Sequence, residues 1–265
     1  MADSPLTPMK PFGVKLDPDA VREALATGAL ERYLFAHRLV LIEGLSPSDE
    51  LLADIARSLG SPQTAHPARA RVEGLPFIKH QVAGPSQNYD AAYWHSDRNF
   101  GPTPAKATVL QCLEAPGSGG ETTLCDAVAT FAALDERTRS VLRGWRGIYE
   151  FGDVMEQPSE RRHADSTELK RLEDFTEPVV LRHPVTGRES IALAERYVRF
   201  TLGENEIDPG RPKLDTLLEI IDQGVVYRHR WKVGDILIWD NFATLHKGES
   251  LDEGAAKVTH RIVVL

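Results

Sequence analysis

Short runs of apolar and β-branched residues, separated by glycine and proline, recur from about residue 76 to the C-terminus, and this pattern constrains the fold most strongly. Strands are expected over residues 77–82, 105–113, 122–125, 147–151, 179–182, 190–194, 225–231, 235–239 and 257–265. The turn Pro-Val-Thr-Gly at residues 184–187 favours a hairpin. Only two or three helices fit between these strands, which favours a β-sandwich or barrel over alternating β-α-β units. The sequence therefore predicts a mainly β fold with flanking helices, of the α+β class.

The first sixty residues have a different pattern, in which helices alternate with one strand. A helix is expected over residues 17–30, a strand over residues 39–42, and a second helix that ends before Gly60. Ser46 is expected to cap the second helix, with Asp49 in the position of a capping-box acid. This region is expected to support the strands as a separate layer.

The chain is expected to form one domain over residues 1–265, with residues from about 15 to 60 as its helical supporting region. Residues 154–173 are polar and lack apolar periodicity, which predicts either a loop or a short surface helix. One interpretation of this segment is a lid.

Composition limits the partners and the compartment. The net charge of −8 argues against nucleic acid and against anionic lipid surfaces, since both attract clustered Lys and Arg. No apolar run is long enough to span a bilayer, and the N-terminus lacks a signal-peptide pattern. The two cysteines, Cys112 and Cys125, have no disulfide or zinc spacing and are expected to be reduced. We expect a cytoplasmic protein with a small-molecule partner, and a homo-oligomer stays open.

Two His-x-Asp triplets occur, His95-Ser96-Asp97 and His163-Ala164-Asp165. With nine histidines and 39 acidic residues in 265 positions, about one such triplet is expected by chance, so its context must decide. The triplet at His163 lies in a charged segment that offers no burial, and we interpret it as a solvated surface. In an extended segment, His95 and Asp97 project to the same side and can present a nitrogen and an oxygen to one ion.

A third ligand would complete the face of two histidines and one carboxylate that non-haem iron(II) oxygenases use, which leaves three coordination positions open. His246 is the candidate, because it follows the apolar strand at residues 236–239 by a short irregular link. Ligands often lie at such strand-to-loop junctions. The alternative for His246 is a core histidine that a backbone carbonyl satisfies.

Four segments carry a resemblance to a known family. They are Trp94-His95-Ser96-Asp97, Gly119-Gly120-Glu121-Thr122, the run Trp-Asp-Asn-Phe-Ala-Thr-Leu-His at residues 239–246, and Arg261. Their order and spacing, from about Pro11 to the C-terminus, resemble the taurine/2,4-dichlorophenoxyacetate dioxygenase family of iron(II)- and 2-oxoglutarate-dependent enzymes. Two departures, Asn99-Phe100 and Glu121, remove no ligand. The carboxylate of Asp97 argues for oxygen transfer over halogenation, which would leave that position to chloride.

The resemblance implies a double-stranded β-helix, or jelly roll, with Fe(2+) held by His95, Asp97 and His246. It also implies that 2-oxoglutarate chelates the iron at one end, while its distal carboxylate meets Arg261 and Thr122. The implied reaction uses O2, converts 2-oxoglutarate to succinate and carbon dioxide, and hydroxylates an organic substrate.

Arg261 suits a buried carboxylate on physical grounds, since a planar guanidinium binds a carboxylate through two hydrogen bonds and stays charged when buried. The alternative is a structural ion pair with an internal Asp or Glu. Lys257 precedes Arg261 by four residues on one expected strand, so both side chains face the same side.

The resemblance therefore makes Lys257 a candidate for binding an anionic group of the substrate. A lysine that extends to solvent is an equally good interpretation. His66 and Tyr93 are further substrate-binding candidates, from their positions in the family pattern.

Two other functions stay open. One keeps the same cofactors but ends in desaturation or an isonitrile-type rearrangement, which the product mass distinguishes from hydroxylation. The other is a non-catalytic binding module on the same barrel, which would release no succinate.

Overall fold

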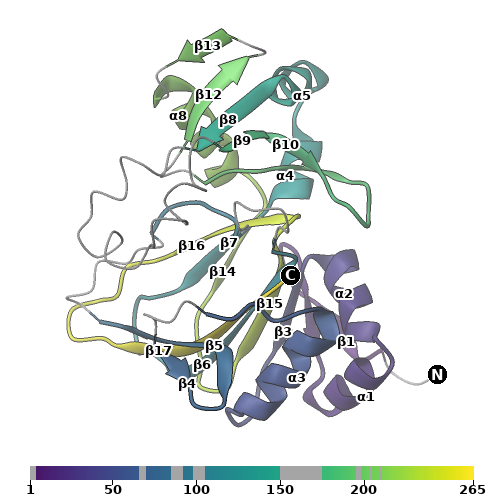
Figure 1. The fold of residues 1–265 in the computed structure, drawn as a ribbon, viewed down its shortest axis with the longest axis vertical. Helices are drawn as coiled ribbons and strands as arrows, with labels where there is room; N and C mark the ends of the chain where they lie inside the picture. Colours follow the sequence, from purple (N-terminus) through teal and green to yellow (C-terminus); the bar gives the residue numbers. More distant parts are fainter. Residues whose placement is uncertain are drawn as a thin grey trace.

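The computed structural model describes residues 4–65, 70–84, 92–97, 105–149, 175–194, 198–202, 205–208 and 211–265. In these residues two facing sheets form the lower body in Figure 1, three helices lie beside it, and a smaller unit lies above. Each of the nine expected strands overlaps a strand of the structure. The mainly β architecture with flanking helices is confirmed.

The larger sheet has eight strands, and all neighbours are antiparallel except β2 and β3. Their order is β1 (Leu6–Pro8), β2 (Val14–Leu16), β3 (Leu39–Ile42), β15 (Ile236–Asp240), β6 (Ala107–Glu114), β17 (Lys257–Val264), β5 (Leu75–Ala83) and β4 (Arg71–Val72). The apolar run in β3 has a physical reason. Val40 and Ile42 pack in the core beneath the helices, whereas Leu39 and Leu41 pack in the core between the sheets. A strand that is buried on both faces has no polar alternation.

The second sheet has three strands in the order β14 (Val226–His229), β7 (Thr122–Asp126) and β16 (Thr244–Gly248). Its inner face meets the large sheet across an apolar core that includes Leu110, Leu124, Trp231 and Trp239. Polar side chains of the candidate site lie at the edge of this core. The face of each strand that points toward this core is called the inner face below.

The outer face of the large sheet is covered by η1 (Pro18–Ala20), α1 (Val21–Ala26), α2 (Ala29–His37) and α3 (Asp49–Leu59). The prediction of one helix over residues 17–30 is wrong, because the chain breaks at Gly28 and a new helix continues to His37. Gly28 has a φ of 64°, a left-handed conformation that glycine adopts without a steric penalty. The supporting helical layer itself is as expected.

Helix α3 begins two residues later than predicted. Its cap is Ser48, whose hydroxyl accepts a hydrogen bond from a backbone N–H at 3.2 Å, so the prediction of Ser46 is wrong. Asp49 then occupies the first helical position, and its carboxylate lies 2.5 Å from Nδ1 of His260 on β17. This contact joins the start of the helix to the sheet. Asp49 is therefore not the acid of a capping box.

In the part of the chain that the structure describes, the upper unit in Figure 1 contains a four-stranded sheet with helices beside it. The strands run in the order β13 (Asn205–Asp208), β12 (Val198–Leu202), β8 (Trp145–Tyr149) and β9 (Phe175–Pro178), and the helices are α4 (Ala127–Ala133), α5 (Glu136–Arg143) and α8 (Arg211–Asp222). The predicted hairpin is confirmed as β10 (Val180–Arg182) and β11 (Glu189–Ile191), with Gly187 at a φ of 68° in the turn.

Some predictions fall outside what can be compared. Residues 154–173, the expected lid, and the triplet at His163 lie outside the described residues. The single-domain organisation stays a prediction. None of the described helices is both long enough and apolar enough to cross a membrane.

Candidate metal centre

Strand β16 and the segment of residues 92–97 bring the three expected metal ligands together. His95 pairs with His246 as an isolated antiparallel bridge, with backbone hydrogen bonds of 3.0 and 2.7 Å in the two directions. His246 lies in the middle of β16, so the prediction that it sits at a strand-to-loop junction is wrong. Asp97 follows His95 by two residues in extended chain, which directs both side chains to one side.

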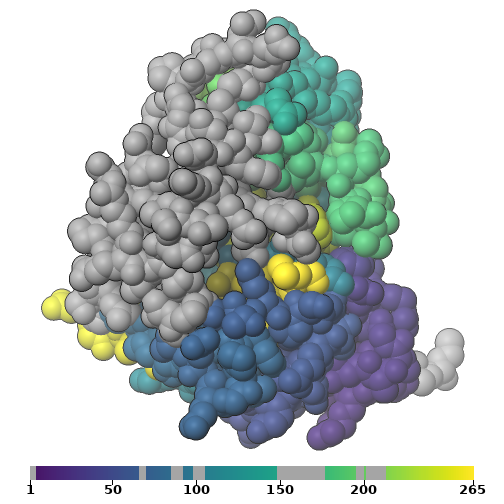
Figure 2. All heavy atoms as spheres, viewed as in Figure 1, coloured from purple at the N-terminus to yellow at the C-terminus, as the bar shows by residue number. Residues whose placement is uncertain are grey.

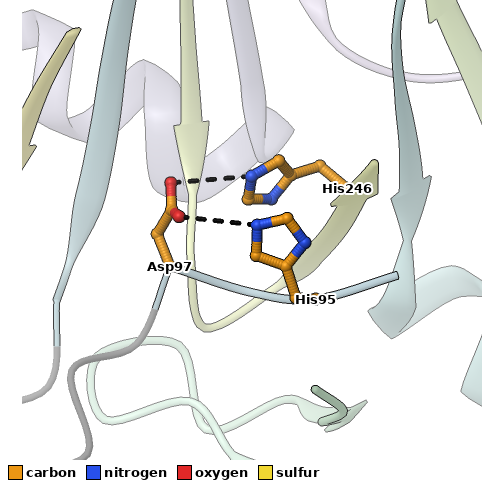
Figure 3. Close-up of side chains that lie close together, drawn as sticks. All are labelled: His95, Asp97 and His246. Atoms are coloured by element: carbon orange, nitrogen blue, oxygen red, sulfur yellow. Dashed lines mark ion pairs between the residues drawn. The ribbon is translucent and has the colours of Figure 1, made fainter. Parts of the chain in front are cut away.

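The three side chains converge, as Figure 3 shows. One ligand atom of each lies within 4.8 Å of those of the other two. Nε2 of His95 is 3.8 Å from Oδ1 of Asp97, and Nε2 of His246 is 3.6 Å from Oδ2 of the same carboxylate. No other trio of His, Cys, Asp or Glu among the described residues converges in this way.

A backbone contact fixes the tautomer of His95. Its Nδ1 lies 2.8 Å from the carbonyl oxygen of Tyr93, and because a carbonyl only accepts, Nδ1 must donate. In the neutral ring Nε2 is then the nitrogen with the lone pair, and it faces Asp97. A hydrogen bond on the far nitrogen is the usual way that proteins orient a metal-binding histidine.

Burial and neighbouring charges keep His246 and Asp97 in the protonation states that bind metal. Burial, together with His95 nearby, lowers the pKa of His246 to about 3, so its imidazole is neutral at ordinary pH. Burial alone would raise the pKa of Asp97, but the charges of Arg261 and the histidines outweigh it and hold that pKa well below its usual range. A neutral imidazole and an ionised carboxylate need lose no proton when a metal ion binds.

Arg261 lies at the metal end of the site. Its Nη2 is 2.5 Å from Oδ1 of Asp97, and its side chain is 21% exposed. The internal acid that a structural ion pair would require is thus Asp97 itself. An anion that Arg261 binds would therefore lie beside the three candidate ligands.

Lys257 lies in a different environment on the same strand. It is 5% exposed, so the interpretation that it extends to solvent is wrong. Its Nζ donates to the carbonyl oxygen of Gly120 at 2.6 Å and lies 5.7 Å from the centre of the Trp231 ring. Trp231 in turn donates from Nε1 to Oγ1 of Thr122 at 3.1 Å. Lys257 and Thr122 are thus linked through Trp231.

Two substrate-binding candidates remain, Tyr93 and His66. Tyr93 contacts His95 through its carbonyl, and its ring lies against the imidazole with the centroids 4.7 Å apart and the ring planes tilted by 36°. A role of Tyr93 in substrate binding stays a prediction. His66 lies outside the described residues.

Three described side chains that were not predicted also contact the site: Thr108, Trp231 and Asn241. Oγ1 of Thr108 donates to Oδ2 of Asp97 at 2.8 Å, and the amide of Asn241 contacts both of these residues. Asn241 lies within residues 239–246, one of the four segments that carry the family resemblance, and this position could have indicated its role. Thr108 and Trp231 have no such signal, because threonine and tryptophan are common in strands.

The donor set fits iron(II). Two imidazoles and one ionised carboxylate, converging from one side, are the ligands of the facial arrangement that leaves positions open for co-substrate and oxygen. Zinc in structural sites instead takes a closed tetrahedral set, usually rich in cysteine. Both cysteines are buried outside this cluster.

Relatives of known function cover nearly the whole chain. An alpha-ketoglutarate-dependent sulfate ester dioxygenase of Pseudomonas putida is 29% identical over 249 residues, covering 88% of this chain and 78% of the relative. An alpha-ketoglutarate-dependent 2,4-dichlorophenoxyacetate dioxygenase of Cupriavidus pinatubonensis is 29% identical over 290 residues, covering 99% and 96%.

Solved structures give the same fold. A taurine dioxygenase from Burkholderia xenovorans superposes with a TM-score of 0.74 at 21% identity, covering 98% of this chain and 88% of that one. The structure of AAD-2 in complex with Mn(II) and N-oxalylglycine gives 0.79 at 21% identity, covering 98% and 96%. The jelly-roll fold that the resemblance implies is confirmed.

The sequence pattern of the taurine catabolism dioxygenase TauD, TfdA family matches residues 2–263, which is almost the entire chain. The protein therefore belongs to this family, whose members are iron(II)- and 2-oxoglutarate-dependent dioxygenases that consume O2.

Proposed function

We propose that this protein holds iron(II) with His95, Asp97 and His246 and hydroxylates a small organic anion. The convergence of two imidazoles and one ionised carboxylate carries the proposal. Iron(II) in such a site supplies oxygen activation, coupled to conversion of 2-oxoglutarate to succinate and carbon dioxide. The residues of the chain bind and orient the two organic molecules.

The contacts of the two cations on β17 favour a placement of 2-oxoglutarate that differs from the one the resemblance implies. A co-substrate that binds metal at one end carries its distal carboxylate away from the metal ligands. Lys257 and Thr122 both contact Trp231, and Lys257 precedes Arg261 by four residues on β17. We therefore assign the distal carboxylate to Lys257 and Thr122. The Lys257 ammonium is buried, and a carboxylate beside it would offset part of that desolvation.

Arg261 becomes the candidate receptor for the anionic group of the substrate. Its guanidinium lies on Asp97, so a carboxylate, sulfonate or sulfate that it binds is held next to the metal ligands. Lys257 and Arg261 are about 13 Å apart along the strand, which is enough to separate two anions. The attached carbon chain would then extend over the open side of the metal centre.

The names of relatives narrow the substrate class. They include a sulfate ester dioxygenase, two 2,4-dichlorophenoxyacetate dioxygenases and a sulfonate dioxygenase. Each named substrate joins an organic group to a carboxylate, sulfonate or sulfate. An anion receptor at Arg261 is consistent with a substrate of this kind.

A spectroscopic experiment tests the metal and co-substrate assignments. Anaerobic protein with iron(II) should develop a weak visible absorption band when 2-oxoglutarate is added, because the co-substrate chelates the metal. The variant His246→Ala should lose this band. A wild-type protein that gives no band contradicts the proposal.

A screen tests the substrate class. Alkyl sulfates, sulfonates, phenoxyacetates and amino acids are incubated with protein, iron(II), 2-oxoglutarate and air, and succinate and product mass are measured. Hydroxylation adds one oxygen to the product, whereas desaturation removes two hydrogens. Succinate release only with uncharged substrates would contradict the role of Arg261.

A further inference from the structure

Asp97 is held by a closed circuit of hydrogen bonds. Oγ1 of Thr108 donates to its Oδ2 at 2.8 Å, and Nδ2 of Asn241 donates to Oγ1 of Thr108 at 3.0 Å. Oδ1 of Asn241 accepts the backbone N–H of Asp97 at 3.4 Å, which closes the circuit. Thr108 is fully buried and Asn241 is 2% exposed, so water does not compete with these bonds.

The direction of every bond in the circuit is determined by chemistry. A backbone N–H only donates, so the atom of Asn241 that faces Asp97 must be the amide oxygen. The amide nitrogen then faces Thr108 and donates to its hydroxyl oxygen. Because that hydroxyl has a single proton, the proton is free to go to the carboxylate of Asp97. The circuit has one consistent arrangement.

The two partners are anchored in rigid parts of the fold, whereas Asp97 is not in a strand. Thr108 lies on β6, which pairs with β15 on one side and β17 on the other. Asn241 follows β15 directly, and its backbone N–H donates to the carbonyl of Lys106 at 3.0 Å. These hydrogen bonds therefore fix the side chain and the backbone of Asp97 relative to the large sheet.

We infer that Thr108 and Asn241 are positioning residues that orient the Asp97 carboxylate for metal binding. Thr108 occupies one lone pair of Oδ2, and Asn241 holds both Thr108 and the backbone of Asp97. Together they restrict rotation of the carboxylate, so it faces both imidazoles before an ion arrives. This inference rests on the proposed role of Asp97 as a metal ligand. Partners of this kind typically change metal affinity by about 10- to 100-fold when they are removed.

Binding of Co(II) alone tests the inference without turnover. The variant Thr108→Val keeps the shape and removes the hydroxyl, and it should bind Co(II) about 10- to 100-fold more weakly in a calorimetric titration, with an altered visible spectrum. Thr108→Ser restores a hydroxyl and should recover both affinity and spectrum. Asn241→Ala should weaken binding, and its effect should not add to that of Thr108→Val, because both act on one circuit.

Thr130→Val is the matched control, since Thr130 is 3% exposed and its hydroxyl accepts from the backbone of Val225 outside the site. It should leave Co(II) affinity unchanged. Thermal unfolding of each variant separates loss of fold from loss of orientation, and Thr108→Ser should bind tightly even if Thr108→Val is unstable.

The possible results distinguish a failure of the proposed function from a failure of this inference alone. A wild-type protein that shows no His246-dependent Co(II) binding overturns the proposed function, and this inference with it. Wild-type binding with an equally tight Thr108→Val, or with a Thr108→Ser as weak as Thr108→Val, overturns only the inference.

Discussion

The inner face of β17 carries two cations, Lys257 at the first residue of the strand and Arg261 near its middle, and the surroundings of the two cations differ. Arg261 lies on the Asp97 carboxylate beside both candidate histidines. Lys257 lies on a backbone carbonyl and near an indole ring, with its pKa lowered to about 8 by burial. In the proposed arrangement, one strand thus supplies a cation at the metal end and another at the co-substrate end.

The difference teaches how a single strand can keep two anions apart. Period-two alternation directs both side chains to the same face, and four residues of spacing separate them by about 13 Å. An always-charged guanidinium suits the end where a carboxylate is already present. A desolvated ammonium suits the end where an incoming anion restores the lost solvation.

Removal of each cation in turn should give the largest changes in ligand affinity. It also distinguishes whether Lys257 or Arg261 binds the distal carboxylate of 2-oxoglutarate. Lys257→Met should raise the Kd of 2-oxoglutarate by about 10- to 150-fold in metal-loaded protein, since hydrogen bonds to charged groups contribute about 1.5–3 kcal/mol. Arg261→Met should change that Kd much less and should instead raise the KM of an anionic substrate. Calorimetry and steady-state kinetics measure the two effects.

The control for this pair is Lys232→Met, which removes an exposed lysine whose ammonium pairs with Glu43 at 3.4 Å and contacts neither site cation. Neither Kd nor KM should change. If Arg261→Met loses 2-oxoglutarate and Lys257→Met does not, then the assignment that the resemblance implies is correct and the one proposed here is wrong.

The pH dependence of co-substrate binding should show the depressed pKa of Lys257. Below pH 8 the ammonium is charged in the free protein, and 2-oxoglutarate binds at full strength. Above pH 8 binding requires uptake of a proton, so the Kd should rise by up to about tenfold per pH unit. Titrations at pH 8.5 in buffers of different ionisation enthalpy should detect this proton. Lys257→Arg should flatten the profile, and an unchanged profile contradicts the role of Lys257.

Much of this site follows from sequence because its physical rules are local. The i and i+2 spacing of His95 and Asp97 predicts that they share one side, and the structure brings them together. The four-residue spacing of Lys257 and Arg261 likewise predicts one face. The apolar runs at residues 105–113 and 235–239 predict β6 and β15, because burial on both faces leaves no polar alternation.

Other features depend on partners that are distant in sequence. Strand β16 reads as a loop, since Thr244–Gly248 includes His, Lys and Gly, and its pairing with β7 comes from tertiary packing. The contact of Thr108 with Asp97 spans eleven residues, and that of Trp231 with Thr122 spans 109. Spacing alone therefore predicts which residues share a face and leaves open which cation lies at which end.

A substitution at Trp231 should have the smallest effect. It tests whether the metal end and the proposed co-substrate end of the site are independent. Trp231→Phe keeps a ring beneath Lys257 but removes the N–H that donates to Thr122, a neutral hydrogen bond that contributes about 0.5–1.5 kcal/mol. The Kd of 2-oxoglutarate should rise by about 2- to 12-fold, while Co(II) affinity stays the same. Trp145→Phe, a change at a buried tryptophan of the upper sheet, should alter neither quantity. A loss of Co(II) affinity in Trp231→Phe would mean that the two ends are coupled through the core, so the division into a metal end and a co-substrate end would not hold.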